Sequence, residues 1–338
     1  MRFGIFDHMD RSGEQLAVQY ENRLAFLDAC DRAGFYSYHL AEHHQTPLGF
    51  APSPSVFLAA AAQRTKNLRL GALVFTLSLY HPLRILDEIC MLDHLSKGRL
   101  DLGLGRGISP IEVGYYGVDA SHSSEIYGEV VAILEQGLRS RVINYQGKHF
   151  TFQNVPVELT PLQKQIPLWY GVAQSESADR AGKNGGNIVC NGPPKMVRDL
   201  GDRFRRAYRQ HHGETAKLPL IGMTRHMVVA DTDAEARELA DPAYLMWAGA
   251  MVHLWNKHGI PITIHIPPTF AEAEKLGICV VGSPSTVRDK LLAQCKAADV
   301  SYFLCRLAFG NIPLAASLKS VELIKREVMP AFAAAEVA

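Results

Sequence analysis

The fold is decided by residues 68–107, which read LRLGALVFTLSLYHPLRILDEICMLDHLSKGRLDLGLGRG. Residues 68–75 are almost wholly apolar and predict a buried strand, and residues 99–105 predict another. Between them, residues 83–95 carry apolar side chains at helical spacing, and Pro82 stands where a helix begins. A strand, a helix and a second strand in this order predict two parallel strands joined by a crossover helix.

The same alternation runs through the rest of the chain. The predicted strands cover residues 2–7, 35–41, 68–75, 99–105, 167–172, 187–190, 218–230 and 301–307. A helical segment follows each strand, as residues 14–33 follow the first. Eight such units predict an α/β protein closed into a (β/α)₈ TIM barrel. An open doubly wound sheet is the alternative, because one miscounted strand would change the architecture.

Two connections are longer than the others. Residues 139–166 hold a predicted hairpin, with strands at 142–145 and 150–152 on either side of Gly147. Residues 257–277 form an insertion between strands seven and eight. Long connections in compact domains are usually lids or binding loops. Because the sequence contains no linker, residues 1–338 are predicted to form one domain.

Composition narrows the class of protein. The 338 residues carry 35 Lys+Arg against 34 Asp+Glu, and 47% are hydrophobic, which is typical of a soluble globular protein and unlike a basic nucleic-acid binder. The six cysteines are scattered singly, as in a reduced compartment. No apolar run reaches the roughly 18 residues of a membrane helix, and the start, MRFGIFDH, is too polar for a signal peptide. We therefore expect a cytoplasmic protein that binds neither nucleic acid nor membranes.

The active site of a TIM barrel lies at the carboxyl ends of its strands, and Glu42, His43 and His44 are the densest polar cluster there. These residue types could bind a metal. Neighbouring strand residues face opposite sides, however, and no helical ligand spacing is present, so no metal is expected. Acid–base catalysis by one histidine is the better hypothesis, because imidazole titrates near neutral pH. Other polar residues expected at this end are Asp7, His8, Thr76, Ser78, Arg106, Gln174, Ser175, Ser177, Asn191 and Arg306.

Two segments predict an anion site. Residues 102–107, LGLGRG, follow the fourth strand, and their glycines let the backbone approach an anion while Arg106 adds positive charge. Gln174, Ser175 and Ser177 follow the fifth strand at the start of a helix, where free amide groups attract anions. Because both segments lie on nearby strands, a phosphate group is expected between them.

Several sequence blocks follow one another along nearly the whole chain. They are residues 2–8, 34–44, 49–54, 68–107, 229–236, 282–287 and 327–330. In this order they resemble the luciferase-like flavin-dependent monooxygenase family, which includes bacterial luciferase and alkanal monooxygenases. The resemblance implies a TIM barrel with an insertion near strand seven. It also implies a flavoprotein oxidoreductase that acts on paired donors with incorporation of O2. Reduced FMN and O2 would form a flavin hydroperoxide, which would attack a small organic substrate.

The resemblance also assigns expected roles to single residues. His43 resembles the family's catalytic histidine, and Glu42 precedes it and would orient it as a second catalytic candidate. Leu73 and Val74 stand where the family often has a non-prolyl cis peptide bond beneath the flavin. Arg106, with Gln174, Ser175 and Ser177, resembles the residues that bind the flavin phosphate. The side chains expected to wall a dry pocket are Phe6, Phe75, Leu77 and Trp247.

Two departures from luciferase concern the phosphate. Residues 121–125, SHSSE, lack the second arginine that luciferase has in this region, and Ala178 replaces a threonine. We therefore expect weak binding of FMN, or a preference for its reduced form. The resemblance further implies a separate flavin reductase and a homodimer packed through residues 59–62 and 85–92. The alternatives are hydride transfer with FMN or a deazaflavin, and a non-catalytic flavin-binding relative.

Overall fold

The computed structural model describes residues 1–262, 264 and 266–335. The strands are β1 (Arg2–Asp7), β2 (Ser37–Leu40), β3 (Arg69–Thr76), β4 (Leu100–Gly105), β5 (Val142–Gln146), β6 (Thr151–Pro156), β7 (Leu168–Val172), β8 (Asn187–Cys190), β9 (Ile221–Val229), β10 (Cys279–Gly282) and β11 (Tyr302–Arg306). The helices are α1 (Leu16–Ala33), α2 (Pro54–Arg64), η1 (Leu77–Leu79), α3 (Pro82–Leu95), α4 (Pro110–Tyr115), α5 (Ser123–Gly137), α6 (Ser175–Asn184), α7 (Pro194–His212), α8 (Asp233–His258), α9 (Phe270–Lys275), α10 (Pro284–Ala298), α11 (Leu314–Leu323), η2 (Ile324–Val328) and α12 (Met329–Ala335).

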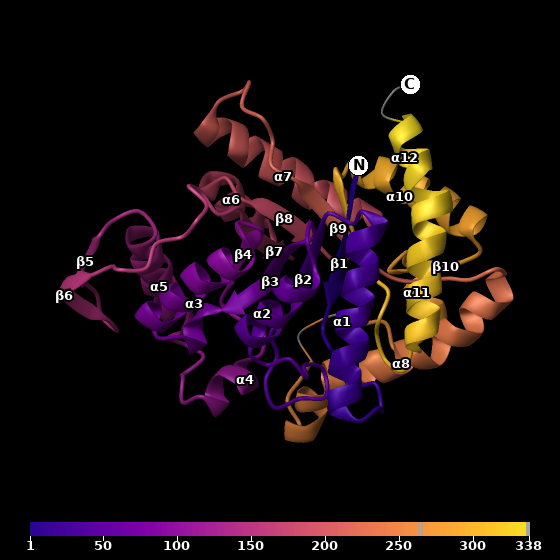
Figure 1. The fold of residues 1–338 in the computed structure, drawn as a ribbon, viewed down its shortest axis with the longest axis horizontal. Helices are drawn as coiled ribbons and strands as arrows, with labels where there is room; N and C mark the ends of the chain where they lie inside the picture. Colours follow the sequence, from indigo (N-terminus) through magenta and orange to yellow (C-terminus); the bar gives the residue numbers. More distant parts are fainter. Residues whose placement is uncertain (263, 265, 336–338) are drawn as a thin grey trace.

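Within these residues, eight parallel strands close a barrel in the order β9, β11, β1, β2, β3, β4, β7 and β8, and β8 pairs back onto β9. The helices surround it, with α1 and α11 packed side by side (Figure 1). Strands in such a barrel are buried on both faces, and every residue of β9 is buried. The predicted TIM barrel is therefore confirmed, and the open sheet is excluded by closure.

The connection between strands seven and eight carries a strand that the sequence did not predict, directly after the predicted insertion of residues 257–277. β10 pairs with residues 226–229 of β9, whereas β8 pairs with residues 221–223, so β10 extends the sheet beyond the closed ring. Its four residues, CVVG, are too short to stand out as a strand in the sequence. The predicted insertion itself holds the end of α8 and the short helix α9. Residues 263 and 265 of the insertion lie outside the described residues.

The predicted hairpin is present as β5 and β6, which pair antiparallel and project from the barrel at the left of Figure 1. Its turn is attached to α5 by one carboxylate, because Glu129 accepts the backbone N–H groups of Lys148, His149 and Phe150. The hairpin is therefore anchored to α5 on the outside of the barrel.

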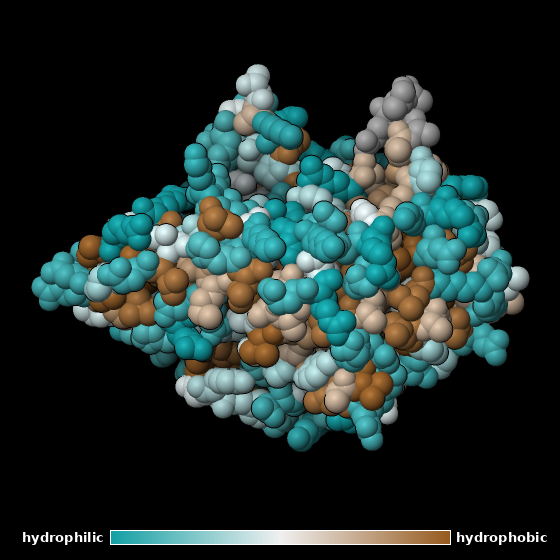
Figure 2. Space-filling view, in the orientation of Figure 1, coloured by the Kyte–Doolittle hydropathy of each residue, from teal (hydrophilic) through white to brown (hydrophobic). Residues whose placement is uncertain are grey.

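The residues expected at a dimer interface are mostly buried within the chain itself. Ala61, Ile85, Ile89 and Cys90 have no exposed surface, because they lie on the faces of α2 and α3 that pack on the barrel. Among the apolar residues exposed on these helices, Val56 is 72% accessible. In Figure 2, hydrophobic residues on the side shown lie scattered among hydrophilic ones. A homodimer through residues 59–62 and 85–92 stays a prediction, and Met91, which is 53% accessible, is an exposed apolar residue of the second segment.

Two further sequence expectations concern the whole chain. Each of the six cysteines is buried and unbonded to another cysteine, consistent with their scattered positions. In the part of the chain that the structure describes, no helix has the length and apolar character to cross a membrane.

Candidate active site

The end of β2 carries the residue best placed for acid–base chemistry. His43 is 8% exposed, and its Nδ1 lies 3.2 Å from Oε1 of Glu112 on α4. Burial alone would raise the pKa of Glu112, but the hydrogen bond with His43 and the backbone N–H of His44 hold this pKa below its ordinary value. The carboxylate therefore accepts the Nδ1 proton. In neutral His43 this leaves Nε2 as a free base.

His44, in contrast, has no ring atom left for catalysis. Its Nε2 donates to Oε1 of Glu42 at 2.7 Å, and its Nδ1 accepts from the hydroxyl of Tyr116 at 2.8 Å. Both ring nitrogens thus have hydrogen-bond partners. The structure therefore separates the two histidines, whose roles the sequence alone could not divide, and favours His43.

The Glu42 carboxylate binds three neighbouring groups instead of orienting His43. Its carboxylate accepts the backbone N–H of Thr76 at 2.8 Å and the hydroxyl of Tyr80 at 3.0 Å, besides His44. This corrects the expected pairing of Glu42 with His43, which Glu112 makes. The physical reason is alternation, because successive residues at a strand end point to opposite sides.

A third histidine stacks on His43 from the end of the neighbouring strand. His8 follows β1, and its ring centroid lies 5.7 Å from that of His43 in a stacked arrangement. Burial, followed by the charge of Arg306, lowers the pKa of His8 well below its ordinary value, so the ring is neutral. Nε1 of Trp247 on α8 donates to His8 Nδ1 at 3.3 Å. Because an indole can only donate, the His8 proton is on Nε2.

The end of β3 provides an apolar shelf beside these histidines. The Leu73–Val74 peptide bond is cis, as the resemblance implied, and the pairing of β3 with β4 shifts its register between Ala72 and Phe75. Leu73 and Val74 both pack with the residues inside the barrel, such as Phe6 and Ala41. A flat apolar ring would find van der Waals contact on this surface.

The register shift corrects two of the predicted pocket walls. Phe75 and Leu77 belong to the large cluster between the barrel and its helices. Because Leu73 and Val74 both face the barrel interior, the alternation is shifted and the side chain of Phe75 points outward. Phe6 and Trp247 do lie at the mouth, where both rings approach Arg306.

Open space lies beside this shelf, on the β7 side of the mouth. Trp169 faces the barrel interior, so Gly171, two residues later on β7, faces inward as well. Gly171 is exposed, and a Cβ atom added there would meet no heavy atom within 4 Å. A glycine at this position of β7 therefore leaves open space where any other residue would place a side chain.

The expected phosphate site lies on the outer rim of the same end. Arg106 directly follows β4 and Gln174 directly precedes α6, and β4 pairs with β7 at Leu102–Leu168. Arg106 is exposed, and its Nη1 donates to Ser124 Oγ at 2.9 Å. Ser177 Oγ accepts from the Gln174 backbone N–H, which closes a capping box at the start of α6.

The donor set at this rim fits a phosphate. The first turn of α6, beginning at Ser175, has backbone N–H groups without helical acceptors, and Arg106 supplies a positive charge on the neighbouring strand end. The two segments that the sequence singled out therefore stand on adjacent strands. Whether these residues bind phosphate stays a prediction.

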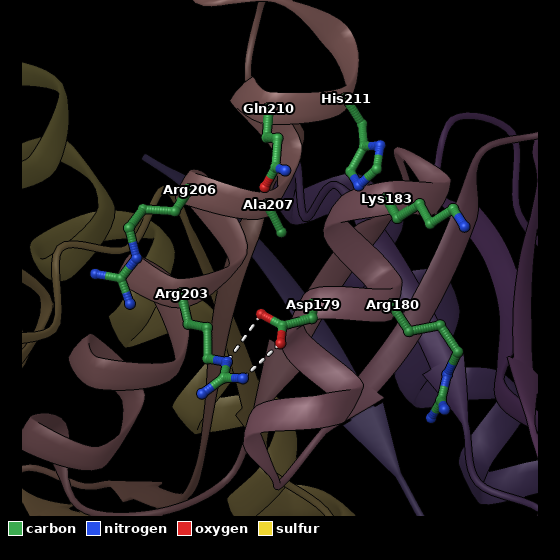
Figure 3. A pocket seen from close by; sticks show the side chains of 8 residues that line it. All are labelled: Asp179, Arg180, Lys183, Arg203, Arg206, Ala207, Gln210 and His211. Carbon is green, nitrogen blue, oxygen red and sulfur yellow. Dashed lines mark hydrogen bonds and ion pairs between the residues drawn. The ribbon is translucent and has the colours of Figure 1, made fainter.

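A groove of about 560 Å³ lies elsewhere, between α6 and α7 (Figure 3). It is lined by basic side chains, of which Arg203 makes a double hydrogen bond with Asp179 at 2.6 and 2.8 Å. Its residues stand in the later turns of both helices, which run back toward the amino-terminal end of the barrel. The groove is therefore distinct from the histidine cluster.

Sequence reasoning missed Glu112 and His226. Ser109 and Glu112 have the spacing of a capping box, and Ser109 does cap α4 by accepting the Glu112 backbone N–H. The Glu112 carboxylate, however, turns to His43 and His44. His226 lies on β9 directly after Thr224 and Arg225, and three successive polar residues inside a predicted strand are themselves a signal of a buried polar site. In the described ranges, no three His, Cys, Asp or Glu side chains are arranged to hold a metal ion.

Comparison with known proteins agrees with this architecture. A curated protein of Sinorhizobium fredii, uncharacterized protein y4wF, is 45% identical over 97% of this chain and 96% of its own length. The oxygenase component of the flavin-dependent trigonelline monooxygenase of Acinetobacter baylyi is 25% identical over 100% of this chain and 97% of its own length.

The fold has a close counterpart among solved structures. The oxygenating constituent of 3,6-diketocamphane monooxygenase from Pseudomonas putida, in complex with FMN, superposes with a TM-score of 0.82 at 21% identity, covering 98% of each chain. The family model of the luciferase-like monooxygenases matches residues 1–300. This protein belongs to the luciferase-like monooxygenase family, whose members are flavin-dependent oxidoreductases.

Proposed function

We propose that this protein is an FMN-dependent monooxygenase that uses reduced flavin and O2 on a small organic substrate. The observation that carries the proposal is the His43–Glu112 pair, which leaves the other imidazole nitrogen of a buried histidine available for a proton. The site suits FMN because an apolar shelf, an open hollow and a rim with an arginine and a helix start follow one another around the mouth.

Bound reduced FMN would supply the oxygen activation, so the chain itself needs few reactive groups. His43 Nε2 would exchange a proton with the reacting group, while Glu112 fixes the ring through Nδ1. Leu73 and Val74 would support one face of the flavin ring. Arg106, Gln174, Ser175 and Ser177 would hold the phosphate. The surrounding apolar and aromatic side chains would exclude water during the reaction.

Two relatives support the cofactor and a partner. The 3,6-diketocamphane monooxygenase constituent was solved with FMN, and the trigonelline enzyme is named as the oxygenase component of a flavin-dependent system. We propose that this chain likewise receives reduced FMN from a separate flavin reductase. Exposed rim residues such as Arg106 would permit rapid exchange of the flavin.

The test is an anaerobic titration of the purified protein with reduced FMN, followed by rapid mixing with oxygenated buffer. We expect saturable binding, tighter for reduced than for oxidised FMN, and re-oxidation of the bound flavin that is clearly slower than that of free FMN. Absence of binding, together with binding of a deazaflavin, would support hydride transfer instead. Binding with re-oxidation at the rate of free FMN would contradict a monooxygenase.

The role of His43 is tested by His43→Gln in the same experiment. We expect reduced FMN to bind within about twofold of the wild-type affinity, and the re-oxidation rate to change by at least about tenfold. His211→Gln is the matched control, because His211 lies in the outer groove and is exposed. Equal effects of the two substitutions would remove His43 from the proposed mechanism.

A further inference from the structure

The β11 end of the barrel mouth holds a buried arginine. Arg306 is 6% exposed and is paired in register with His226 of β9. Its guanidinium carbon lies 4.8 Å from the ring centroid of Phe6 and 5.4 Å from that of Trp247. The cation therefore lies among aromatic rings inside the same mouth that contains His43.

This guanidinium has no anionic partner in the described part of the chain. Its Nε is buried without a hydrogen bond, and the contact of Nη1 is a 3.4 Å approach to Nε2 of His226. Burial lowers the pKa of Arg306 to about 9, so the side chain is still charged at neutral pH. A buried charge without a partner is costly, which makes its retention here a strong indication of a missing anion.

The nearby acid Asp10 does not fill this role. Its charge acts on Arg306, but among the residues described Asp10 Oδ1 and Arg306 Nε are both buried without a hydrogen-bond partner, so the two groups do not pair. Asp10 Oδ2 instead accepts the backbone N–H of Gly310 at 2.7 Å. Burial also raises the pKa of Asp10 to about 7, so the carboxyl is only partly ionised at neutral pH.

A second buried arginine, Arg225, shows which contacts an arginine with a structural role makes. Arg225 has no exposed surface and also lacks a carboxylate partner. Each of its nitrogens nevertheless has a contact: Nε with Gln294 at 2.8 Å, Nη1 with the Thr224 carbonyl at 2.7 Å and Nη2 with the Met223 sulfur at 2.7 Å. The chain thus supplies contacts to every guanidinium nitrogen of Arg225, which packs outward. It leaves the guanidinium of Arg306, which faces the mouth, without such a set of partners.

A row of rings leads from Arg306 to the proposed acid–base group. Arg306 lies over Trp247, Trp247 donates to His8, and His8 stacks on His43. The expected phosphate rim is at β4 and β7, and β1, β2 and β3 separate it from β11 in the barrel. An anion at Arg306 would therefore be bound independently of the FMN phosphate, on the opposite side of the mouth.

We propose that Arg306 binds a carboxylate of the substrate, so that this enzyme acts on a small organic acid whose apolar body lies between Arg306 and His43. The assignment rests on the proposed function for the reaction, whereas binding of the acid needs no flavin. Nothing in the aromatic surroundings of Arg306 selects one carbon skeleton, so the anionic group is what defines the substrate class.

The test compares two matched pairs of probes that differ mainly in charge, benzoate with benzamide and octanoate with octanamide. Isothermal titration at pH 7 measures each against the flavin-free protein. In at least one pair we expect the carboxylate to bind about tenfold or more tightly than its amide. Equal affinities in both pairs, or no detectable binding of any probe, would overturn the proposal.

Variants then assign the preference to the residue. Arg306→Met should abolish the preference, and Arg306→Lys should keep part of it, with thermal melting used to verify that both fold. Arg106→Ala should leave the preference unchanged. Retention of the full preference in Arg306→Met would overturn the proposal, as would its loss in Arg106→Ala, which would place the anion at the phosphate rim. If reduced FMN does not bind but the carboxylate preference holds, the proposed reaction fails while the acid site stands.

Discussion

The inner and outer parts of the candidate site are built in different ways. Inside the mouth, His43, His44 and the two carboxylates Glu42 and Glu112 are buried and joined by hydrogen bonds. On the rim, Arg106 is exposed and donates to a serine, and the start of α6 is closed by its own capping box. The chemistry end is thus held by several buried hydrogen bonds before any ligand binds, whereas the arginine of the phosphate end is held by one exposed contact.

This difference indicates separate roles for the two parts, one in acid–base chemistry and the other in binding the flavin phosphate. A preorganised acid–base group lowers the reorganisation needed during reaction, because its neighbours already hold it in place. An exposed arginine gains less from a phosphate than a buried one, since water screens the charges. The contrast therefore fits a protein that binds its flavin briefly and reacts in a fixed pocket.

The largest expected effect concerns the inner part. Glu42→Ala would leave the Thr76 backbone N–H, the Tyr80 hydroxyl and the His44 ring without their acceptor in a buried place. We expect the free energy of unfolding to fall by about 3–5 kcal/mol, as measured by urea denaturation. Glu176→Ala, on the exposed first turn of α6, should change it by less than about 0.5 kcal/mol. Similar losses for both would mean that the inner network is no more rigid than the rim.

The next effect tests the rim. Arg106→Ala should weaken binding of reduced FMN by about 10- to 100-fold, because a charge-assisted contact to phosphate is lost. Binding of reduced riboflavin, which lacks the phosphate, should change by less than about twofold. Arg180→Ala is the control, since Arg180 is exposed on α6 but lines the outer groove. Equal losses for FMN and riboflavin would show that Arg106 acts on the ring or on the fold.

The sequence predicted the barrel well because its signals are local. Each strand is a short apolar run, and each carboxyl end is marked by polar residues such as those at 42–44 and 174–177. The hairpin at 142–156 was visible for the same reason. β10 was not predicted, because its four residues carry too little pattern, and its partner on β9 lies more than fifty residues away.

The candidate site was only partly predictable, since its contacts join distant segments. The pairing of His43 with Glu112 spans 69 residues, and the capping spacing of Ser109 and Glu112 pointed to a local use of that carboxylate. The inward turn of Leu73 and Val74 likewise follows from a register shift against β4. Alternation along an ideal strand would have placed one of them outside.

A smaller effect follows from the pH dependence of the inner part. The pKa of Glu112 is lower in the folded chain than its ordinary value of 4.5, so its carboxylate stabilises the fold above that pH and the stabilisation is lost as the pH falls through the folded-state pKa. Glu112→Gln should cost about 1–2 kcal/mol at pH 7. The difference from wild type should shrink toward pH 3.5 in urea denaturation. A constant difference across this range would show that the carboxylate charge is unimportant.

The smallest expected effect concerns a serine on the rim. Ser177 Oγ accepts the Gln174 backbone N–H at 3.2 Å and donates to the Gln174 carbonyl at 2.6 Å, at the start of α6. Ser177→Ala should reduce the free energy of unfolding by about 0.5–1 kcal/mol, as for an exposed helix cap. Binding of reduced FMN should weaken only a few-fold, because the backbone N–H groups of the first turn stay in place. A loss as large as that of Arg106→Ala would mean that the hydroxyl itself binds the phosphate, and the rim would then be as preorganised as the pocket it surrounds.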